Sequence, residues 1–471
     1  TRWVADAGRQ IDYWITAGTP ADVMARYADA TGHAPELPSW ASGFWQSKLR
    51  YRTQDELLAV ARRYRDRDIP VAVIVADFFH WTASGDWRFD PAEWPDPTAM
   101  IAELKAMGTR LMVSIWPLVS SVSSNYAKMA RRGLLVSAEH GLPFVAQFPE
   151  KGYPASIPSA LHDPTNPEAR EYLWSEVRRN YFDLGVRVWW LDACEPELKP
   201  AHPAGLRFHA GAGDEVYNLY PRDHARGFYE GMLDAGSSEV VSLCRSAWAG
   251  SQRYGAAVWS GDIPATWDSL RRQIPAGLSI ALSGIPWWTT DIGGFHGGDP
   301  GDPAFRELVV RWFQYGAFCP LFRLHGDRLP KAQFGADMTG GPNEVWSFGD
   351  EAFEMISQVL SLRERIRPYI HEQMYRAHEV GLPPMRPLFV DWPDDAMSWM
   401  VEDEFLLGPD VLVAPVVELG ARNREVYLPP GRWVDAWTGA AHVGATTVLA
   451  EAPLERIPVF IRGDASVPIA G

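Results

Sequence analysis

The sequence has few of the residues from which disulfide frameworks and metal sites are built. Its 471 residues include three cysteines, Cys194, Cys244 and Cys319, too few to staple a small secreted fold. The twelve histidines are scattered, with neither an H-x-H pair nor an H-E-x-x-H motif, which argues against metal-dependent hydrolysis. We therefore expect no metal and no cofactor, and we expect Cys194 and Cys244 to be buried, inert thiols.

Positive charge and long apolar runs are also scarce. The net charge is −15, whereas nucleic acids and anionic membranes are bound by basic faces, so neither is expected as a partner. No run of about 18 apolar residues is present, which excludes a typical membrane-spanning helix. The sequence also lacks a G-x-S-x-G elbow for acyl transfer and a P-loop for phosphoryl transfer.

The start of the chain gives little information on location. Thr1 is neither an initiator methionine nor part of a signal-type apolar segment. We expect a processed or truncated start and a cytoplasmic protein.

Apolar and aromatic residues, in contrast, are abundant. The sequence is 46% hydrophobic and 22% charged, as in a globular protein, and its length predicts two or more domains. It contains 22 tryptophans, whose flat rings suit protein cores and also suit the faces of sugar rings.

Between residues 40 and 330, short apolar segments alternate with helical segments. This rhythm predicts a (β/α)8 TIM barrel, and a doubly wound sheet is the alternative, although no glycine-rich turn follows an early strand. The expected strands are 43–47, 71–76, 111–116, 186–191, 240–245, 258–262, 285–290 and 320–324. The expected helices are 53–66, 97–108, 167–184, 304–318 and 351–366, with Thr53, Asp96 and Asn166 near their starts.

The sequence divides into three regions around this barrel. Residues 1–35 contain an expected strand, 11–15, and a helix that starts at Thr19 and Pro20. Residues 36–370 form the expected barrel, with an irregular excursion rich in proline and serine at about 118–165. Residues 371–471 have turn residues around short strands, which predicts a C-terminal all-β sandwich.

Polar or aromatic residues close most of the expected barrel strands. Because the carboxyl ends of barrel strands meet at one face, we expect these residues to share one mouth, although a single Asp at a strand end is often only a cap. Paired carboxylates in an aromatic pocket fit cleavage of a glycosidic bond. The residues are Asp77, Trp116, Asp192, Arg245, Asp262, Asp291 and His325.

Several motifs along the chain resemble those of glycoside hydrolase family 31. Trp190–Glu195, WLDACE, resembles the segment that carries the family's nucleophile, W-x-D-x-x-E. The further similar blocks, in the family's order, are 245–255 with Trp259–Asp262 (WSGD), Trp287–Phe295 (WWTTDIGGF), Phe322–Gly326 (FRLHG), and 407–415 with 427–433. The resemblance covers nearly the whole chain, except that a family member normally carries an N-terminal β-sandwich, of which residues 1–35 resemble only the end and the linker.

The resemblance implies a retaining, exo-acting hydrolase of α-glycosides that works by double displacement. Asp192 would be the nucleophile and Asp262 the general acid and base, with the two carboxyl groups about 5–5.5 Å apart. We expect Arg245 to hold Asp192 ionised, and the charge of Asp192 to raise the pKa of Asp262.

The resemblance also implies the residues that hold the sugar. Asp77, Arg245, Asp291 and His325 would bind its hydroxyl groups, and Trp116 and Trp259 would form apolar walls, although packing of the barrel is an equal explanation for Trp259. Glu195 would support its neighbours, and Glu197 is interpreted as a solvated loop charge.

The identity of the sugar is less defined. Segments 44–51 and 75–81 look most like bacterial α-xylosidases, which favours an α-xyloside. A bulky Phe78, Phe79 or Trp81 would exclude the CH2OH group of glucose, whereas Asp77 would accept a hydrogen bond from it. An α-glucosidase, an α-galactosidase, a transglycosylase of the same family and a catalytically silent carbohydrate-binding relative remain alternatives, and a homo-oligomer remains open.

Overall fold

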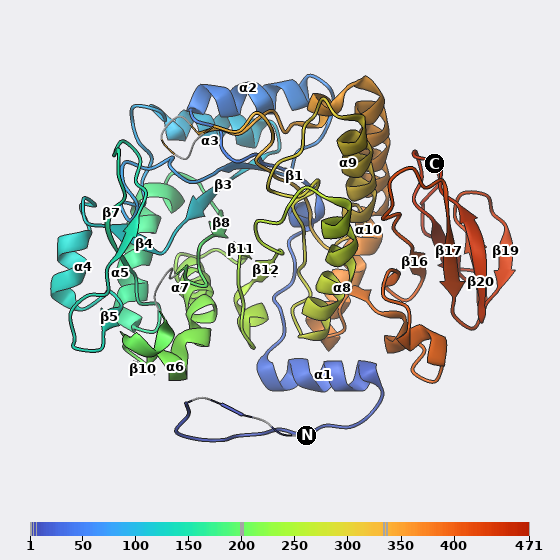
Figure 1. Ribbon diagram of the computed structural model, residues 1–471, viewed down its shortest axis with the longest axis horizontal. Coiled ribbons are helices and arrows are strands. Elements are labelled where there is room, and N and C mark those ends of the chain that lie inside the picture. Colours follow the sequence, from blue (N-terminus) through green and yellow to red (C-terminus); the bar gives the residue numbers. More distant parts are fainter. Residues whose placement is uncertain are drawn as a thin grey trace.

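A parallel sheet of seven strands forms the centre of the protein (Figure 1). The computed structural model describes residues 2, 4–5, 7–197, 202–332, 335 and 338–470. The strand order is β12-β11-β8-β3-β2-β1-β13, and every neighbouring pair is parallel. The strands are β1 (Phe44–Gln46), β2 (Val73–Ala76), β3 (Arg110–Ile115), β8 (Val188–Leu191), β11 (Val241–Cys244), β12 (Ala256–Val258) and β13 (Phe322–Leu324).

Segment 288–292 occupies the place of the eighth strand and closes the sheet into a barrel. Trp288 forms a parallel bridge with Val258 of β12, and Ile292 forms one with Leu324 of β13. The expected strand 285–290 is therefore reduced to isolated bridges, but its position in the ring is correct. The ring excludes the doubly wound sheet, which has two open edges.

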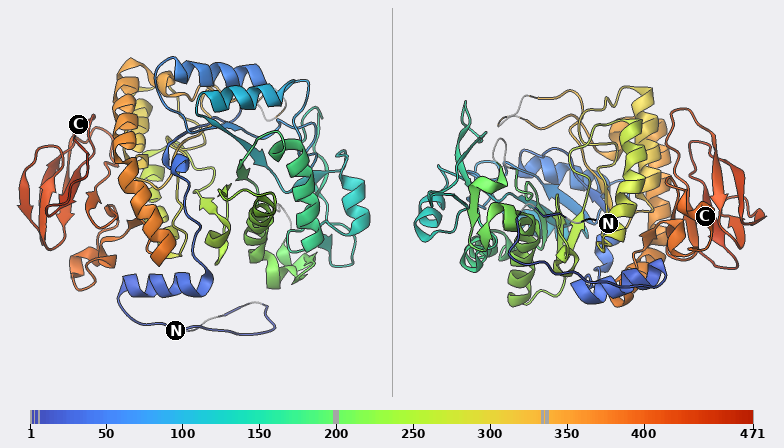
Figure 2. Two further views of the ribbon diagram at one scale, coloured as in Figure 1. Left: turned by 180° about the vertical axis from the view of Figure 1, so that it is seen from behind. Right: turned by 60° about the horizontal axis from the view of Figure 1, so that its bottom comes forward.

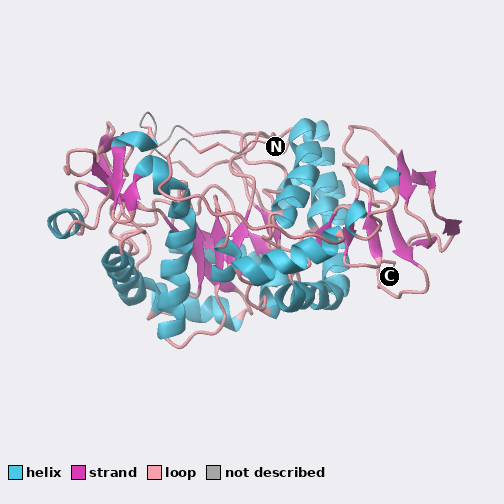
Figure 3. Ribbon diagram, turned by 90° about the horizontal axis from the view of Figure 1, so that it is seen from below, coloured by secondary structure: helices cyan, strands magenta, loops and turns pink. Residues whose placement is uncertain are grey.

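Helices surround the barrel strands, as Figure 3 shows from below. The strands are apolar and buried because helices cover their outer faces, as in other parallel sheets. The expected caps at Asp96 and Asn166 are confirmed, and Thr53, expected as the first helical residue, also acts as a cap: each side chain accepts a hydrogen bond from a main-chain N–H in the first turn. The helices are α2 (Gln54–Arg65), α3 (Pro97–Ala106), α5 (Pro167–Val177), α7 (Tyr220–Asp234), α8 (Trp267–Leu282), α9 (Pro303–Gly316) and α10 (Asp350–Val380).

Two excursions extend from the barrel at the end opposite to the C-terminal domain (Figures 1 and 3). The region expected to be irregular instead contains short antiparallel strands, and β5 of the first excursion pairs with β9, which follows β8. Their elements are β4 (Leu118–Ser120), α4 (Tyr126–Arg132), β5 (Ser137–Ala138), β6 (Ala146–Phe148), β7 (Ile157–Leu161), β9 (Leu206–Phe208), β10 (Gly211–Ala212) and α6 (Gly213–Val216).

The C-terminal domain is antiparallel throughout and lies beyond α9 and α10 (Figures 1 and 2). A six-stranded sheet and the ribbon β17–β20 share a core that contains Leu412, Val426 and Phe460. The strands are β14 (Met385–Arg386), β15 (Phe405–Leu407), β16 (Val411–Val413), β17 (Asn423–Leu428), β18 (Arg432–Asp435), β19 (Ala441–Val443), β20 (Thr446–Glu451) and β21 (Val459–Arg462). A barrel followed by an all-β domain is the fold class that the sequence predicts.

Three sequence predictions of element boundaries are wrong. Residues 11–15 form no strand: the segment runs along the outside of the molecule, and Ile11 is 90% exposed (Figure 2). The strand expected at 258–262 is β12, which covers Ala256–Val258 instead. The chain beyond it turns at Gly261, whose φ of +76° favours glycine. Helix α10 continues past Ile366 to Val380, although it contains Pro368.

Near the N-terminus, helix α1 (Pro20–Thr31) agrees with the prediction. Thr19 caps it, and the Thr19 and Asp22 side chains form a capping box. The helix lies along one side of the barrel, below α8 in Figure 1. Among the helices of the described residues, none is both long enough and apolar enough to cross a membrane.

Candidate active site

Five of the seven predicted mouth residues directly follow a barrel strand. They are Asp77 after β2, Trp116 after β3, Asp192 after β8, Arg245 after β11 and His325 after β13. Because these strands are parallel, their carboxyl ends open on one face of the barrel. Asp262 follows β12 after a short loop, and Asp291 lies in the segment that closes the ring.

Arg245 holds a group of acidic side chains at this face. Its Nη1 lies 3.5 Å from Oδ1 of Asp192 and 3.4 Å from Oδ2 of Asp262, so both predicted catalytic carboxylates share one guanidinium nitrogen. Its Nε and Nη2 donate to Glu195 at 2.7 and 3.1 Å. Nη2 also donates to Glu197 at 3.2 Å, so Glu197 is an exposed loop charge, as interpreted, that also pairs with Arg245.

The two carboxylates differ in exposure. The side chain of Asp192 is 11% exposed, and that of Asp262 is 39% exposed. Burial raises the pKa of Asp192 to about 6; Arg245 opposes this shift and Asp262 adds to it. Arg245 thus favours the ionised form, as expected, but burial outweighs it, and Asp192 is ionised only above about pH 6.

The pKa of Asp262 is also raised. Burial is the main cause, and the charges of Glu197 and Glu195 add to it, while Arg245 acts in the opposite direction. The direction agrees with the sequence prediction, but the carboxylates that raise it most are the two glutamates of the β8 loop. A raised pKa favours a protonated Asp262, the form that a general acid requires.

His325, Asp77 and Ser47 form a second group at the mouth. Nε2 of His325 lies 3.8 Å from Oδ2 of Asp77, and Nδ1 of His325 lies 2.8 Å from the hydroxyl of Ser47. Burial, with the charges of Arg323 and Arg328, lowers the pKa of His325 well below its usual value, so the ring is neutral. Burial raises the pKa of Asp77 well above its usual value, and Asp192 adds to the shift.

Arg323 and Asp291 form an ion pair with no exposed side-chain surface. Burial raises the pKa of Asp291 to about 7, although Arg323 opposes the shift. The guanidinium carbon of Arg323 lies 4.5 Å from the ring centre of Trp190 and 5.4 Å from that of Trp259. Trp259 therefore contributes to barrel packing, and its predicted role as a wall of the sugar pocket stays a prediction.

Sequence reasoning missed two of these residues. Ser47 follows β1 just after Gln46, so reading the end of the first expected strand as well as the later ones would have found it. Arg323 lies inside β13, where a charged residue in an apolar strand was the available signal.

Aromatic side chains line one side of the mouth. Trp116 stacks on Phe78 with ring centres 5.3 Å apart and an angle of 10° between the rings. Trp81 and Phe148 of β6 approach Trp116 edge-on, each at 5.6 Å. The first excursion therefore contributes Phe148 to an aromatic wall that is otherwise formed by residues following β2 and β3.

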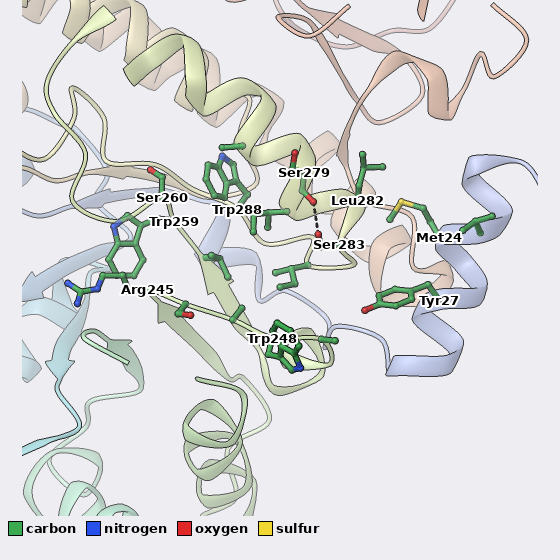
Figure 4. A pocket seen from close by; sticks show the side chains of 18 of the residues that line it. Met24, Tyr27, Arg245, Trp248, Trp259, Ser260, Ser279, Leu282, Ser283 and Trp288 are labelled. Carbon is green, nitrogen blue, oxygen red and sulfur yellow. Dashed lines mark hydrogen bonds between the residues drawn. The ribbon is translucent and has the colours of Figure 1, made fainter. Parts of the chain in front are cut away.

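A groove of about 970 Å³ lies outside the mouth, between α8 and α1 (Figure 4). Met24 and Tyr27 of α1 face Ser279 and Leu282 of α8 across it. Arg245 lines its inner end, but the guanidinium points away from α1 in this view. None of the carboxylates held by Arg245 lines the groove, which therefore belongs to the outer side of the barrel wall.

Cys194, Cys244 and Cys319 are buried. Burial raises the pKa of the Cys194 thiol to about 12, which makes a reactive thiolate unfavourable at neutral pH. Within the described residues, no group of three His, Cys, Asp or Glu side chains is arranged to hold a metal ion.

Comparison with known proteins assigns the family. Residues 34–373 match the glycosyl hydrolases family 31 TIM-barrel domain, and residues 381–467 match the glycosyl hydrolase family 31 C-terminal domain.

Individual relatives agree with this match. The chain is 37% identical over 477 residues to an α-xylosidase of Saccharolobus solfataricus, covering 99% of this chain and 60% of that protein. It is 33% identical over 474 residues to α-glucosidase 2 of Bacillus thermoamyloliquefaciens, covering 98% of this chain and 57% of that protein. The crystal structure of a family 31 α-xylosidase from a soil metagenome, complexed with xylose, superposes with a TM-score of 0.91 at 53% identity over 96% of this chain and 67% of that chain.

The chain spans about three fifths of the length of the curated relatives it matches. The matches to both domain models cover the barrel and the antiparallel domain in the order in which the structure has them. The chain belongs to glycosyl hydrolase family 31.

Proposed function

We propose that the protein is a retaining, exo-acting α-glycoside hydrolase that releases a terminal α-linked xylose. The observation that carries the proposal is the placement of Asp192 and Asp262 on the same nitrogen of Arg245 at the mouth of the barrel. Glycoside cleavage uses such a pair of carboxyl groups in two different protonation states.

The proposed reaction has two steps. The ionised carboxylate of Asp192 attacks the anomeric carbon, while Asp262 gives its proton to the glycosidic oxygen as the bond between that oxygen and the carbon breaks. Asp262, now ionised, then takes a proton from water, and the water oxygen displaces Asp192 from the anomeric carbon. Two inversions leave the released sugar in its original α configuration.

The other mouth residues would hold the sugar for this reaction. Asp77 and the neutral His325 would bind hydroxyl groups, and Ser47 would orient the His325 ring through its contact with Nδ1. Arg245 would keep the two acids and Glu195 in place. Fixed positions lower the entropic part of the barrier, because the reacting groups are already aligned.

The preference for xylose rests on the aromatic wall and on the relatives. Phe78 stacks on Trp116 beside Asp77, where it would fill the space that the CH2OH group of glucose needs. The α-xylosidases among the relatives support the same substrate class. An α-glucosidase is the second candidate, because the relatives include one and because Asp77 offers an acceptor near the same place.

Turnover of p-nitrophenyl α-xyloside, α-glucoside and α-galactoside tests the proposal. We expect the xyloside to be the best substrate, and Asp192→Ala and Asp262→Ala each to lower kcat by about 10³-fold or more. Asp268→Ala, on the exposed side of α8, is the matched control and should keep wild-type activity. Wild-type protein that cleaves none of the three would reject the proposal.

Two further readouts separate the alternatives. Proton NMR of the first product should show α-xylose, and initial release of the β anomer would contradict retention. Added xylose should not become the main acceptor, and disaccharide as the main product would instead indicate a transglycosylase.

A further inference from the structure

Arg323 is a buried residue that packs against the two segments leading to the predicted catalytic acids, Asp192 and Asp262. It belongs to β13, and its side chain has no exposed surface. Its guanidinium packs on Trp190, two residues before Asp192, and on Trp259, three residues before Asp262. The two indole rings also meet edge-on at 5.5 Å. One cation thus supports the two segments whose ends carry Asp192 and Asp262.

The polar groups around Arg323 are only partly satisfied. Nη1 pairs with Oδ1 of Asp291, while Nε and Nη2 of Arg323 and Oδ2 of Asp291 have no hydrogen-bond partner among the described residues. A buried donor or acceptor without a partner costs about 1–3 kcal/mol, so such groups persist mainly where they serve a site. Packing of the barrel alone would be better served by apolar side chains.

The charge of Arg323 acts on most of the mouth. It opposes the effect of burial on Asp77, Asp262 and Asp291, and it disfavours protonation of His325. Arg245, by comparison, acts from the rim, where it is partly exposed and pairs with Asp192, Asp262, Glu195 and Glu197. The site therefore has one cation at the rim and one beneath the floor.

We propose that Arg323 and Asp291 form a positioning pair beneath the sugar pocket, in which Arg323 aligns the Trp190 and Trp259 segments and places a positive charge beneath the mouth. This role differs from the hydroxyl contact that the family resemblance implies for Asp291, because the Asp291 side chain has no exposed surface and pairs with Arg323. This role rests on the proposed glycosidase function and deepens it, since it assigns the electrostatic balance of the mouth to a residue outside the substrate contacts.

The pH dependence of kcat/KM for p-nitrophenyl α-xyloside tests the charge. Arg323→Met removes the charge and keeps the length, so kcat/KM should fall roughly tenfold or more, because the Trp190 and Trp259 segments lose the cation that aligns them. The basic limb should move up by about half a pH unit or more, because Asp262 keeps its proton longer. Arg323→Lys keeps the charge and should return the limb to its wild-type position.

Arg311→Met is the matched control, because Arg311 is another buried arginine, on α9, whose main-chain partners lie in the C-terminal domain. Arg311→Met should lower Tm and leave the acidic and basic limbs of the pH profile of kcat/KM in place. Arg323→Met with wild-type limbs, or Arg323→Lys with the same shift as Arg323→Met, would overturn the role of the charge.

A thermal unfolding cycle of Arg323→Met, Asp291→Asn and the double variant tests the pair without any turnover. The double variant should lose no more Tm than the worse single variant, since either change already breaks the pair. Additive losses would overturn the pairing. If wild-type protein cleaves no glycoside, the proposed function fails, and this cycle still decides whether Arg323 and Asp291 act together.

Discussion

At the scale of single residues, the activity should depend on the ionisation of Asp192. Its pKa of about 6 predicts that kcat/KM falls as the pH drops below about 6, because a protonated Asp192 cannot attack the anomeric carbon. Arg245→Met should move this limb to higher pH, since Arg245 favours the ionised form. Rates between pH 4 and 9 measure the limb, and a limb that stays in place in Arg245→Met would contradict the assignment.

The buried carboxylate of Asp192 should also lower the free energy of unfolding when it is ionised. The folded-state pKa of Asp192, about 6, lies above its unfolded value, so the folded protein binds the proton more tightly. The ionised side chain therefore destabilises the fold as the pH rises from about 4 to 6, and by a constant amount above that. Asp192→Asn should raise the free energy of unfolding by on the order of 3 kcal/mol at pH 8.

At pH 4 this gain should nearly vanish, because Asp192 is then protonated in the folded state. Urea unfolding at both pH values measures the difference, with Asp268→Asn as the exposed control. An equal effect of Asp192→Asn at the two pH values would show that burial of the ionised carboxylate is not what destabilises the fold.

Substrate choice should depend on the wall formed by Phe78. Its ring stacks on Trp116, and truncation would open space beside Asp77 for a CH2OH group. Phe78→Ala should shift the ratio of kcat/KM for xyloside over glucoside toward glucoside by about 10–200-fold. Phe148→Ala, which removes an outer neighbour of Trp116, is the matched control and should change the ratio less.

At the scale of elements, the sequence predicted strand ends better than strand lengths. Asp77, Asp192 and His325 follow their strands as expected, because an apolar run that stops at a polar residue marks the barrel mouth locally. The eighth strand was overpredicted, because segment 288–292 makes only isolated bridges, and pairing depends on neighbours that the local sequence does not show. The acids on Arg245 are brought together by the fold, which is why the local sequence did not predict the ion pair of Glu197.

Helix α10 extends past its predicted end because its last turns make tertiary contacts: Ile370 and Met374 are buried, and the Tyr369 hydroxyl donates to the carbonyl oxygen of Leu407 at 3.0 Å. Arg363 on this helix donates to the carbonyl oxygens of Ser42, Ala317, Cys319 and Pro320, at 2.6–2.8 Å. Arg363→Met would leave these oxygens without their donor in the core, at a cost of on the order of 3–5 kcal/mol. Urea unfolding should show a lower midpoint, and Arg376→Met, at an exposed position of α10, should leave it nearly unchanged.

At the scale of the whole molecule, α9 ties the C-terminal domain to the barrel. Arg311 on α9 donates to the carbonyl oxygens of Ala421, Ala452, Pro453 and Arg456, at 2.7–3.2 Å. Glu307, one turn earlier, accepts from the N–H of Gly420 at 2.9 Å and from Arg422 at 2.7 Å. These contacts all reach loops of the antiparallel domain, and none of them reaches the mouth of the barrel.

Loss of this connection should therefore loosen the C-terminal domain before it affects turnover. In Arg311→Met, hydrogen exchange in residues 417–458 should quicken, because their carbonyl oxygens lose a buried donor, while exchange in β2, β3 and β8 stays at the wild-type rate. Turnover of the xyloside at 25 °C should be retained, and Tm should fall by about 1–2 °C for each kcal/mol that is lost. Equal quickening in the barrel strands would mean that the two domains unfold as one unit and that α9 stabilises both.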